Sequence, residues 1–240
     1  MVIDSTARHS DLELLEIHAR TLYTHDASGR LLAVNDGGGK PAARLFLGWT
    51  SRGTIWRVRG DLPSDLVTRI GELVARDPPT GDLRRPPACL SAVRAALQDH
   101  GPVDDTEEGG PAYCFGDIIE GTGGAVSVTE RNAHVLHRWL PAWLPDVSNQ
   151  LPIMAVLVDG AAVAICACAR IPGEATEAGV ETHEAFRGHG YAGTATAAWA
   201  RAIRDLGIIP LYSTGWRNIA SQRVAAKLGL SCYGASVSIG

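Results

Sequence analysis

The segment RGHGYAGT, residues 187–194, carries three glycines in a G-x-G-x-x-G spacing and leads directly into an apolar stretch that predicts a helix. Glycine allows a backbone to approach a phosphate closely, and the free amides and dipole at a helix N-terminus favour an anion there. Arg187 would add a permanent positive charge. The loop is therefore predicted to hold a phosphate group, and the question is which ligand carries that phosphate.

A dinucleotide is the first ligand to test. A Rossmann fingerprint needs a tight turn from strand to helix at the first glycine and an acidic residue roughly 20 positions later. Here HEAFR separates the predicted strand from Gly188, and the later segment GIIPLYST has no carboxylate. Too few residues follow the loop to complete a doubly wound sheet. The sequence therefore disfavours a dinucleotide oxidoreductase.

Two motifs together favour another ligand. Arg187, Gly190 and Ala192 form R-x-x-G-x-A, and the downstream segments WRNIAS (216–221) and KLGL (227–230) form N-x-x-[AS] followed by K-x-G-[FL]. This pair of motifs resembles the pyrophosphate loop and the following strand-to-helix segment of the GNAT superfamily of acyl-CoA-dependent N-acyltransferases. The combination E-T-x-x-x-F-R-G-x-G-x-A with W-x-N-x-x-S-x-x-x-A-x-K-L-G is most similar to the zwittermicin-resistance-like branch.

The resemblance covers residues 125–240 and implies an α/β (α+β) fold of GNAT type, with a mixed, mostly antiparallel central sheet flanked by helices. The acidic, glycine-rich stretch GPVDDTEEGG reads as a connector. We therefore expect a smaller N-terminal α+β domain over 1–110, a connector over 111–124 that could add a strand, and the acyltransferase domain over 125–240. The N-terminal region could act as a lid, form a dimer surface or complete the sheet.

Local patterns predict the elements that must position these motifs. In the N-terminal half we expect a helix over 10–21, hairpins in LYTHDASGRLLAV and ARLFLGWTSRGTIWRVRG, and helices from about Pro63 and in LSAVRAALQDHG. In the C-terminal half, Thr129 could cap a helix ERNAHVLHRWL, and Asp159-Gly160 predicts a hairpin turn between IMAVLVD and AAVAICACAR. The strand EAGVET, a helix, the strand IPLYST, a second helix and a last strand follow.

The resemblance implies acetyl-CoA as cosubstrate, with no metal. Its pyrophosphate would lie on the glycine loop, its pantetheine arm along EAGVET, and the helix after Asn218 beside that arm. The contacts that this arrangement implies are Val180, Glu181, Thr182, Arg187, Gly188, His189, Gly190, Tyr191, Ala192, Asn218 and Ser221. A purely structural interpretation stays open for Asn218 and Ser221, because both residue types cap helices.

Acyl transfer also needs a base, because an alkyl amine has a pKa on the order of 10 and must lose a proton before it attacks. Glu181 is the candidate, beside the expected thioester, although it could equally be a structural glutamate bound to a neighbouring helix. By strand parity Glu181 and Thr182 cannot both face the acceptor unless a bulge intervenes. Many GNAT enzymes place a proton-donating tyrosine where Ala225 stands, so Tyr212 becomes the candidate acid, ahead of Tyr191 and Tyr233.

Several other histidine, tryptophan and cysteine residues could take part in chemistry, but structural interpretations are available for them. His134 and His137 lie one helical turn apart without a visible third ligand, which favours a solvated helix face over a zinc site. Trp139 and Trp143 fall in the arm that shapes the acceptor pocket in GNAT folds, and they could line it or belong to the core. Cys166 and Cys168 alternate on a predicted strand and should both point to one face as small apolar residues.

The composition and charge of the chain exclude some classes of function. The chain has 240 residues, a net charge of -4 and no basic block, so nucleic acid is not an expected partner. No apolar segment is long enough to cross a bilayer, no signal peptide is visible, and five scattered cysteines fit a reducing compartment, which together predict a cytoplasmic protein. We expect an N-acetyltransferase acting on a small-molecule or protein amine, with a homodimer left open. The alternative is a non-catalytic acyl-CoA-binding or regulatory module.

Overall fold

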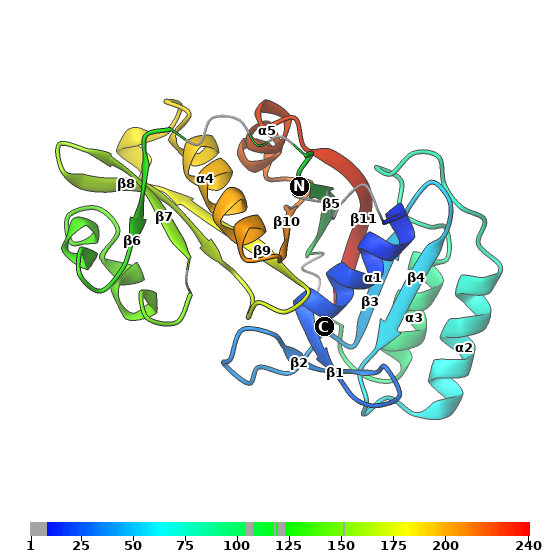
Figure 1. Ribbon diagram of the computed structural model, residues 1–240. Helices are drawn as coiled ribbons and strands as arrows, with labels where there is room; N and C mark the ends of the chain where they lie inside the picture. Colours follow the sequence, from blue (N-terminus) through cyan, green and yellow to red (C-terminus); the bar gives the residue numbers. More distant parts are fainter. Residues whose placement is uncertain (1–8, 104–107, 118, 120–122, 151) are drawn as a thin grey trace. The chain divides into compact units, whose positions relative to one another are not determined.

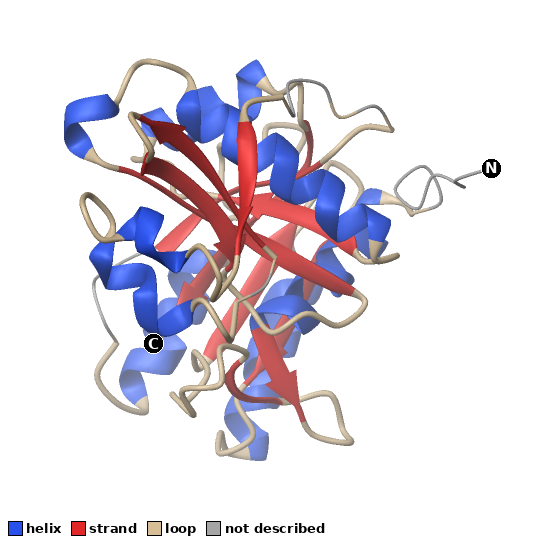
Figure 2. Cartoon of the chain, turned by 60° about the vertical axis from the view of Figure 1, so that its left-hand side comes forward, coloured by secondary structure: helices blue, strands red, loops and turns tan. Residues whose placement is uncertain are grey.

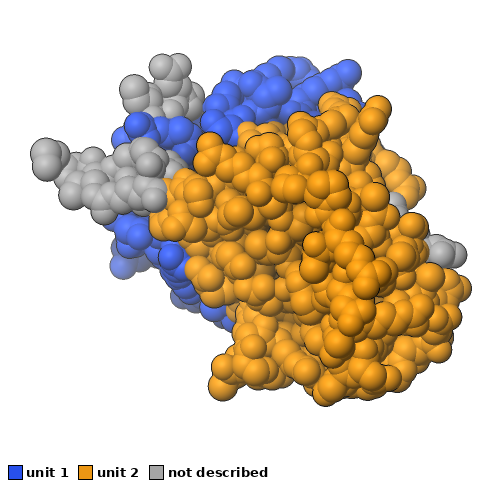
Figure 3. Space-filling model, turned by 90° about the vertical axis from the view of Figure 1, so that its right-hand side faces the viewer, with its two compact units in different colours: residues 1–6, 114–212, 218–231 blue, residues 7–113, 213–217, 232–240 orange. Residues whose placement is uncertain are grey.

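The computed structural model describes residues 9–103, 108–117, 119, 123–150 and 152–240. The chain divides into two compact units, and each is assembled from discontinuous segments (Figure 3). Of the described residues, unit 1 takes those in 114–212 and 218–231, and unit 2 takes those in 7–113, 213–217 and 232–240. The domain boundaries expected from the sequence stay a prediction.

Unit 1 is built around a sheet with the strand order β10-β9-β8-β7-β6 (Figure 1). Its strands are β6 (Ala125–Val128), β7 (Ile153–Val158), β8 (Ala161–Cys168), β9 (Ala175–Thr182) and β10 (Ile209–Ser213). All neighbouring pairs in it are antiparallel except β9 and β10, which run parallel. The predicted mixed, mostly antiparallel sheet is confirmed.

The hairpin between β7 and β8 forms the centre of this sheet. Its turn is Asp159-Gly160, with φ of 49° and 76°. Two successive positive φ values fit the tight hairpin turns whose twist matches that of the strands. Every residue of β8 is buried, as expected for a strand that is covered on both faces. The predicted hairpin is confirmed.

Helices lie against both faces of the unit 1 sheet (Figure 2). The helices of unit 1 are the short 3₁₀ helices η1 (Ala133–Leu136), η2 (Pro141–Asp146) and η3 (Glu184–Phe186), and the α-helices α4 (Tyr191–Asp205) and α5 (Ile219–Lys227), and those on the two faces are α4 on one and η1 and η2 on the other. Helix α4 packs on β7, β8 and β9 and buries Ala195, Trp199 and Ile203. On the other face η1 and η2 contribute to a core cluster that contains Leu136 and Ile165.

The helix expected in ERNAHVLHRWL is wrong: the structure has only the single turn η1 there. Asn132 explains the difference. Its side chain accepts a hydrogen bond from the Thr129 amide at 2.7 Å and donates one to the Ser127 carbonyl at 2.9 Å. These bonds fold the backbone back on β6, and polar side chains that bond locally to the main chain compete with helix formation. Pro141 then begins η2.

Unit 2 is an α+β assembly with the sheet order β4-β3-β11-β5 and a separate hairpin β1-β2. Its elements are α1 (Asp11–Leu22), β1 (Tyr23–His25), β2 (Leu31–Val34), β3 (Leu45–Trp49), β4 (Thr54–Val58), α2 (Ser64–Ala75), α3 (Leu90–Asp99), β5 (Glu108–Cys114) and β11 (Ser231–Ile239). Both N-terminal hairpins and all three helices agree with the patterns in the sequence.

Strand β11, from the C-terminal end of the sequence, belongs to this N-terminal sheet. It pairs antiparallel with β3, from Ala235 opposite Trp49 to Ile239 opposite Leu45. The segment that follows β10 also joins unit 2, because the Thr214 amide donates to the Pro111 carbonyl at 3.2 Å. A Cβ on Gly110 would lie 1.8 Å from the Thr214 carbonyl oxygen, so only glycine permits this approach.

Candidate active site

The loop between β9 and α4 has the backbone that its glycines predict. After the turn η3, Gly188 and Gly190 take φ values of 86° and 87°, in the left-handed region that disfavours other residues. A Cβ at either position would find no atom within 4 Å. The glycines are therefore required by backbone conformation, and the space beside them is open.

Helix α4 begins at this loop with Gly190 as its N-cap, and no side chain caps it. The first intrahelical bond runs from the Thr194 amide to the Gly190 carbonyl at 3.2 Å. The preceding amides, on Tyr191, Ala192 and Gly193, have no acceptor among the described residues. Because these amides and the helix dipole both point toward the open side of the loop, this end of α4 suits an anion.

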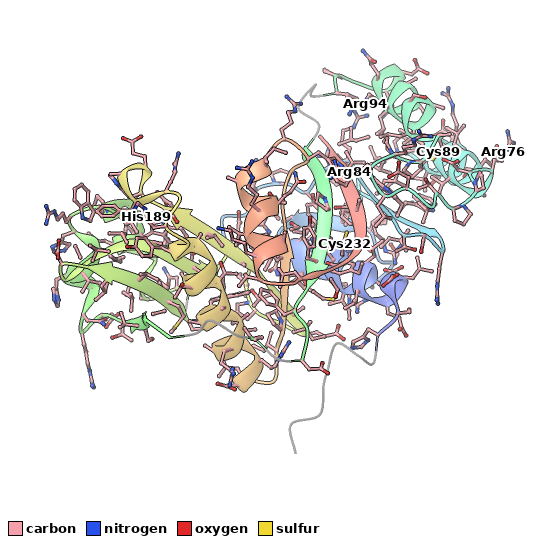
Figure 4. The ribbon with its side chains drawn as sticks, turned by 90° about the horizontal axis from the view of Figure 1, so that it is seen from above. Arg76, Arg84, Cys89, Arg94, His189 and Cys232 are labelled. Carbon is pink, nitrogen blue, oxygen red and sulfur yellow. The ribbon has the colours of Figure 1, made fainter. Side chains whose placement is uncertain are left out.

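Two cationic or titratable side chains flank the loop. Arg187 is exposed, and its Nε donates to the Thr182 carbonyl at 3.3 Å. His189 lies in the loop that leads into α4 (Figure 4). Its Nδ1 is 3.1 Å from the Arg187 carbonyl, and its ring stacks on Tyr191 with centroids 5.5 Å apart. The His189 side chain therefore lies between the Arg187 backbone and Tyr191, the first residue of α4.

Strand β9 has a free edge beside the loop. Its parallel pairing with β10 runs only from Ala175 opposite Ile209 to Glu177 opposite Leu211, whereas its pairing with β8 continues to Thr182. Among the described residues no register partner on β10 follows Leu211. The two strands therefore separate after their first three pairs, which leaves one edge of β9 open.

Ladder alternation shows which backbone groups line this open edge. The His183 amide donates to the Val163 carbonyl, and the Ala169 amide donates to the Glu177 carbonyl. In an antiparallel ladder such residues alternate with residues whose amides and carbonyls point to the other side. The main-chain groups of Val180 and Thr182 therefore face away from β8, toward the opening between β9 and β10.

Side-chain alternation separates Glu181 from its neighbours. Glu181 pairs with Ile165, which belongs to the core cluster under η1 and η2. Val180 pairs with Cys166, on the face covered by α4. The parity argument from the sequence is thus correct: Glu181 and Thr182 lie on opposite faces of β9. Glu181 is exposed and accepts a hydrogen bond from Trp143 Nε1 at 2.5 Å.

Helix α5 is fixed at both ends. The Asn218 side chain accepts from the Ser221 amide at 3.0 Å and so caps the helix. At the other end Gly229, with φ 63°, leads the Leu230 amide back to the Ala225 carbonyl at 3.0 Å, the bond of a Schellman motif. The capping role of Asn218 is confirmed, whereas its contact with a cosubstrate stays a prediction.

Tyr212 lies at the end of β10 and is 2% exposed. Its hydroxyl is 2.7 Å from the Ser221 hydroxyl. Ala225 stands one turn further along α5, fully buried, and its side chain has no proton to give. Tyr212 thus contacts α5 one helical turn before Ala225, and its role as the acid stays a prediction.

Residues 154–235 match the model of the GNAT acetyltransferase family. This segment belongs to the GNAT acetyltransferases. The match contains both the glycine loop and the capped helix α5, and it spans less than half of the chain. Assignment to the zwittermicin-resistance-like branch stays a prediction. A search of curated protein sequences finds no significant match.

Solved GNAT structures are similar to the chain at low identity. A putative GNAT-family acetyltransferase from Novosphingobium aromaticivorans is 18% identical over 58% of this chain and 68% of its own, with a TM-score of 0.42. A GCN5-related N-acetyltransferase-like protein from Streptococcus suis is 16% identical over 83% and 84%, with a TM-score of 0.44. A tandem GNAT protein from the clavulanic acid biosynthesis pathway is 15% identical over 85% and 79%, with a TM-score of 0.48. With TM-scores this low, the family assignment rests on the sequence match.

An aromatic cluster in the GNAT segment and its N-terminal flank was not foreseen. The Trp139 ring lies 4.7 Å from His183 and 5.3 Å from Phe186 by ring centroids. Trp139 also packs against the core under η1 and η2, which agrees with one of its two interpretations, and its place in an acceptor pocket stays a prediction. Phe186 precedes the glycine loop in the sequence, and that place in the motif was the only available signal.

The structure also places the remaining candidate residues. His134 and His137 are both exposed at η1, and within the described residues no cluster of three or more His, Cys, Asp or Glu side chains could hold a metal. Cys166 and Cys168 are buried on the α4 face of β8, and burial raises the pKa of both thiols. No helix in the described part of the chain is long and apolar enough to cross a membrane.

Proposed function

We propose that the protein is an acyl-CoA-dependent N-acyltransferase that transfers an acetyl group from acetyl-CoA to a primary amine by direct attack on the thioester. The observation that carries the proposal is the open edge of β9 next to the uncapped N-terminus of α4. Membership of residues 154–235 in the GNAT acetyltransferases supports acetyl-CoA as the cosubstrate.

The backbone of unit 1 offers binding groups for two parts of coenzyme A, its pyrophosphate and its pantetheine arm. Amides from Gly188 to Ala192 would hold the pyrophosphate, with Arg187 as an additional positive charge. The open edge of β9 at Val180 and Thr182 would bind the amide-bearing pantetheine arm as an added strand would bind. Ser221, in the first turn of α5, would contact the same arm.

In the reaction, Glu181 accepts a proton from the ammonium form of the acceptor, directly or through one water. The neutral nitrogen then forms a bond to the thioester carbonyl carbon, and a main-chain amide at the open edge of β9, that of Val180, donates to the developing oxyanion. The carbon–sulfur bond breaks, and the thiolate receives a proton from the Tyr212 and Ser221 hydroxyl pair. The extra proton of the amine nitrogen leaves to solvent, solvent returns a proton to the hydroxyl pair, and Glu181 releases its proton to solvent before the next turnover.

Calorimetry with coenzyme A, followed by thiol release from acetyl-CoA with a panel of amines, tests the proposal. We expect binding at the α4 loop and turnover with at least one amine. The buried Ala225 at the usual acid position favours a second candidate, a non-catalytic acyl-CoA-binding module, which would bind tightly without turnover. The absence of any affinity for coenzyme A would refute both.

The role of Glu181 has its own test. Replacing Glu181 by Gln keeps the size and the acceptor oxygen but removes the base, so kcat should fall by about 10²-fold, the lower end for general acid–base catalysis. The acid limb of the pH–rate profile should disappear. If the profile of Glu181→Gln equals that of the wild type, Glu181 is not the base.

A further inference from the structure

One contact in unit 1 links the proposed base to a distant part of the chain. Trp143 Nε1 donates to Glu181 Oε2 at 2.5 Å, and the two residues are 38 positions apart in the sequence. Trp143 belongs to η2 and Glu181 to β9. A bond from an N–H group to a carboxylate is charge-assisted, and such bonds are shorter and stronger than neutral ones.

The donor side of this contact is held firmly. Trp143 packs against the core cluster that covers one face of the sheet. Pro141 starts η2 and Pro145 lies within it, and proline fixes φ and so limits the freedom of this turn. The indole N–H is therefore held by packing that does not depend on Glu181.

On the Glu181 side, only one of the two carboxylate oxygens takes part in the bond. Glu181 is exposed, and Trp143 is its one hydrogen-bond donor among the described residues. Oε2 takes the indole bond, which leaves Oε1 available. A carboxylate with one oxygen fixed and one open has a defined orientation and can still accept a proton.

We propose that Trp143 is a positioning residue that fixes the Glu181 carboxylate as the base of acyl transfer. This inference rests on the proposed function.

Trp143→Phe is the decisive variant, because it removes the N–H group and keeps a large aromatic ring. We expect kcat/KM to fall by about tenfold, as the loss of one charge-assisted bond implies. Trp139→Phe is the matched control. It removes an indole from the same segment between β6 and β7 and leaves the bond between Trp143 and Glu181 in place, so Glu181→Gln should cause the same loss in this background as in the wild type.

A double-variant cycle separates positioning from general structural support. In the Glu181→Gln background, Trp143→Phe should cause no further loss, because its effect passes through the carboxylate. If Trp143→Phe lowers the activity of Glu181→Gln by the same factor as it lowers that of the wild type, the inference is overturned.

The contact has a readout that needs no turnover. The indole N–H resonance of Trp143, identified by its absence in Trp143→Phe, should move in Glu181→Gln, because its bond to a carboxylate becomes a bond to an amide. An active enzyme in which this resonance does not respond to Glu181→Gln overturns the positioning role alone. A responding resonance in a protein that transfers no acyl group overturns the proposed function, and the positioning role of Trp143 with it.

Discussion

The hydroxyl groups of Tyr212 and Ser221 lie 2.7 Å apart and join the end of β10 to the first turn of α5. Ser221 and Ala225 are four residues apart and so share one face of α5. A hydroxyl pair therefore stands one helical turn from the position that lacks a proton donor. In the proposed reaction, this hydroxyl pair would supply the proton that the leaving thiolate takes up.

If the pair acts as one donor, Tyr212→Phe and Ser221→Ala should each lower kcat by about tenfold, a modest loss because thiols are fairly acidic leaving groups. The double variant should lose no more than either single variant, since groups that act as a unit are not additive. Steady-state thiol release measures all three. Full activity in both single variants would exclude the pair from the proton transfer.

Gly190 should be sensitive to alanine for two reasons. Its φ of 87° is strained for any residue with a Cβ, which costs about 1–2 kcal/mol in stability. A shift of the loop would also misalign the free amides of α4, so we expect at least a tenfold weaker affinity for coenzyme A by calorimetry. Gly29, at φ 79° in the β1-β2 turn with open space around it, is the control. Gly29→Ala should lose similar stability and keep its affinity.

The two roles of Asn218 can be separated by residue choice. Asn218→Ala removes the cap of α5 and should cost about 1 kcal/mol in thermal or denaturant unfolding. Asn218→Ser keeps a side-chain acceptor and should retain most of that stability. If Asn218 also contacts the cosubstrate, Asn218→Ser should bind coenzyme A less tightly. Unchanged binding by Asn218→Ser would limit Asn218 to its structural role.

Thiol labelling should distinguish the exposed Cys232 from the four buried cysteines by its faster reaction. Cys232 is the exposed one of the five cysteines, whereas the others are buried. Burial raises the pKa of Cys89 to about 12 and that of Cys166 well above its ordinary value, so both remain thiols near neutral pH and react slowly.

We expect a disulfide reagent to label a single thiol in the native protein and five after unfolding. The sulfur of Cys232 is partly covered, and burial raises its pKa too. Its labelling rate should therefore keep rising above the pH at which an ordinary thiol is already ionised. Cys232→Ser should abolish the native signal. A second fast thiol would contradict the burial of the other four.

Local signals predicted most of the secondary structure. The Asp159-Gly160 turn, the glycines of the α4 loop and the Asn218 cap each depend on neighbouring residues, and the structure contains all three. The helix that was wrongly expected around η1 also depended on neighbouring residues, because the Asn132 side chain bonds to two backbone groups that precede it, the Thr129 amide and the Ser127 carbonyl. A helical pattern of apolar residues does not reveal such a competing bond.

Contacts between distant residues set the limit of prediction. The Trp143–Glu181 bond and the Trp139–His183 ring contact each join segments that have no shared pattern in the sequence. The parity of β9 could be predicted from its alternation, but which face carried η2 depended on the packing of the whole sheet. The site was therefore predicted as a set of backbone positions, and its side-chain partners were not.

The pairing of β3 with β11 also has a consequence for synthesis. Residues 45–49 cannot pair with residues 235–239 until that later segment has been synthesised and has left the ribosome. The nascent sheet therefore stays incomplete, and the unpaired edge of β3 is exposed to chaperones or to aggregation during that interval. Codon changes that slow translation between β3 and β11 should lengthen this interval, although they leave the amino-acid sequence unchanged.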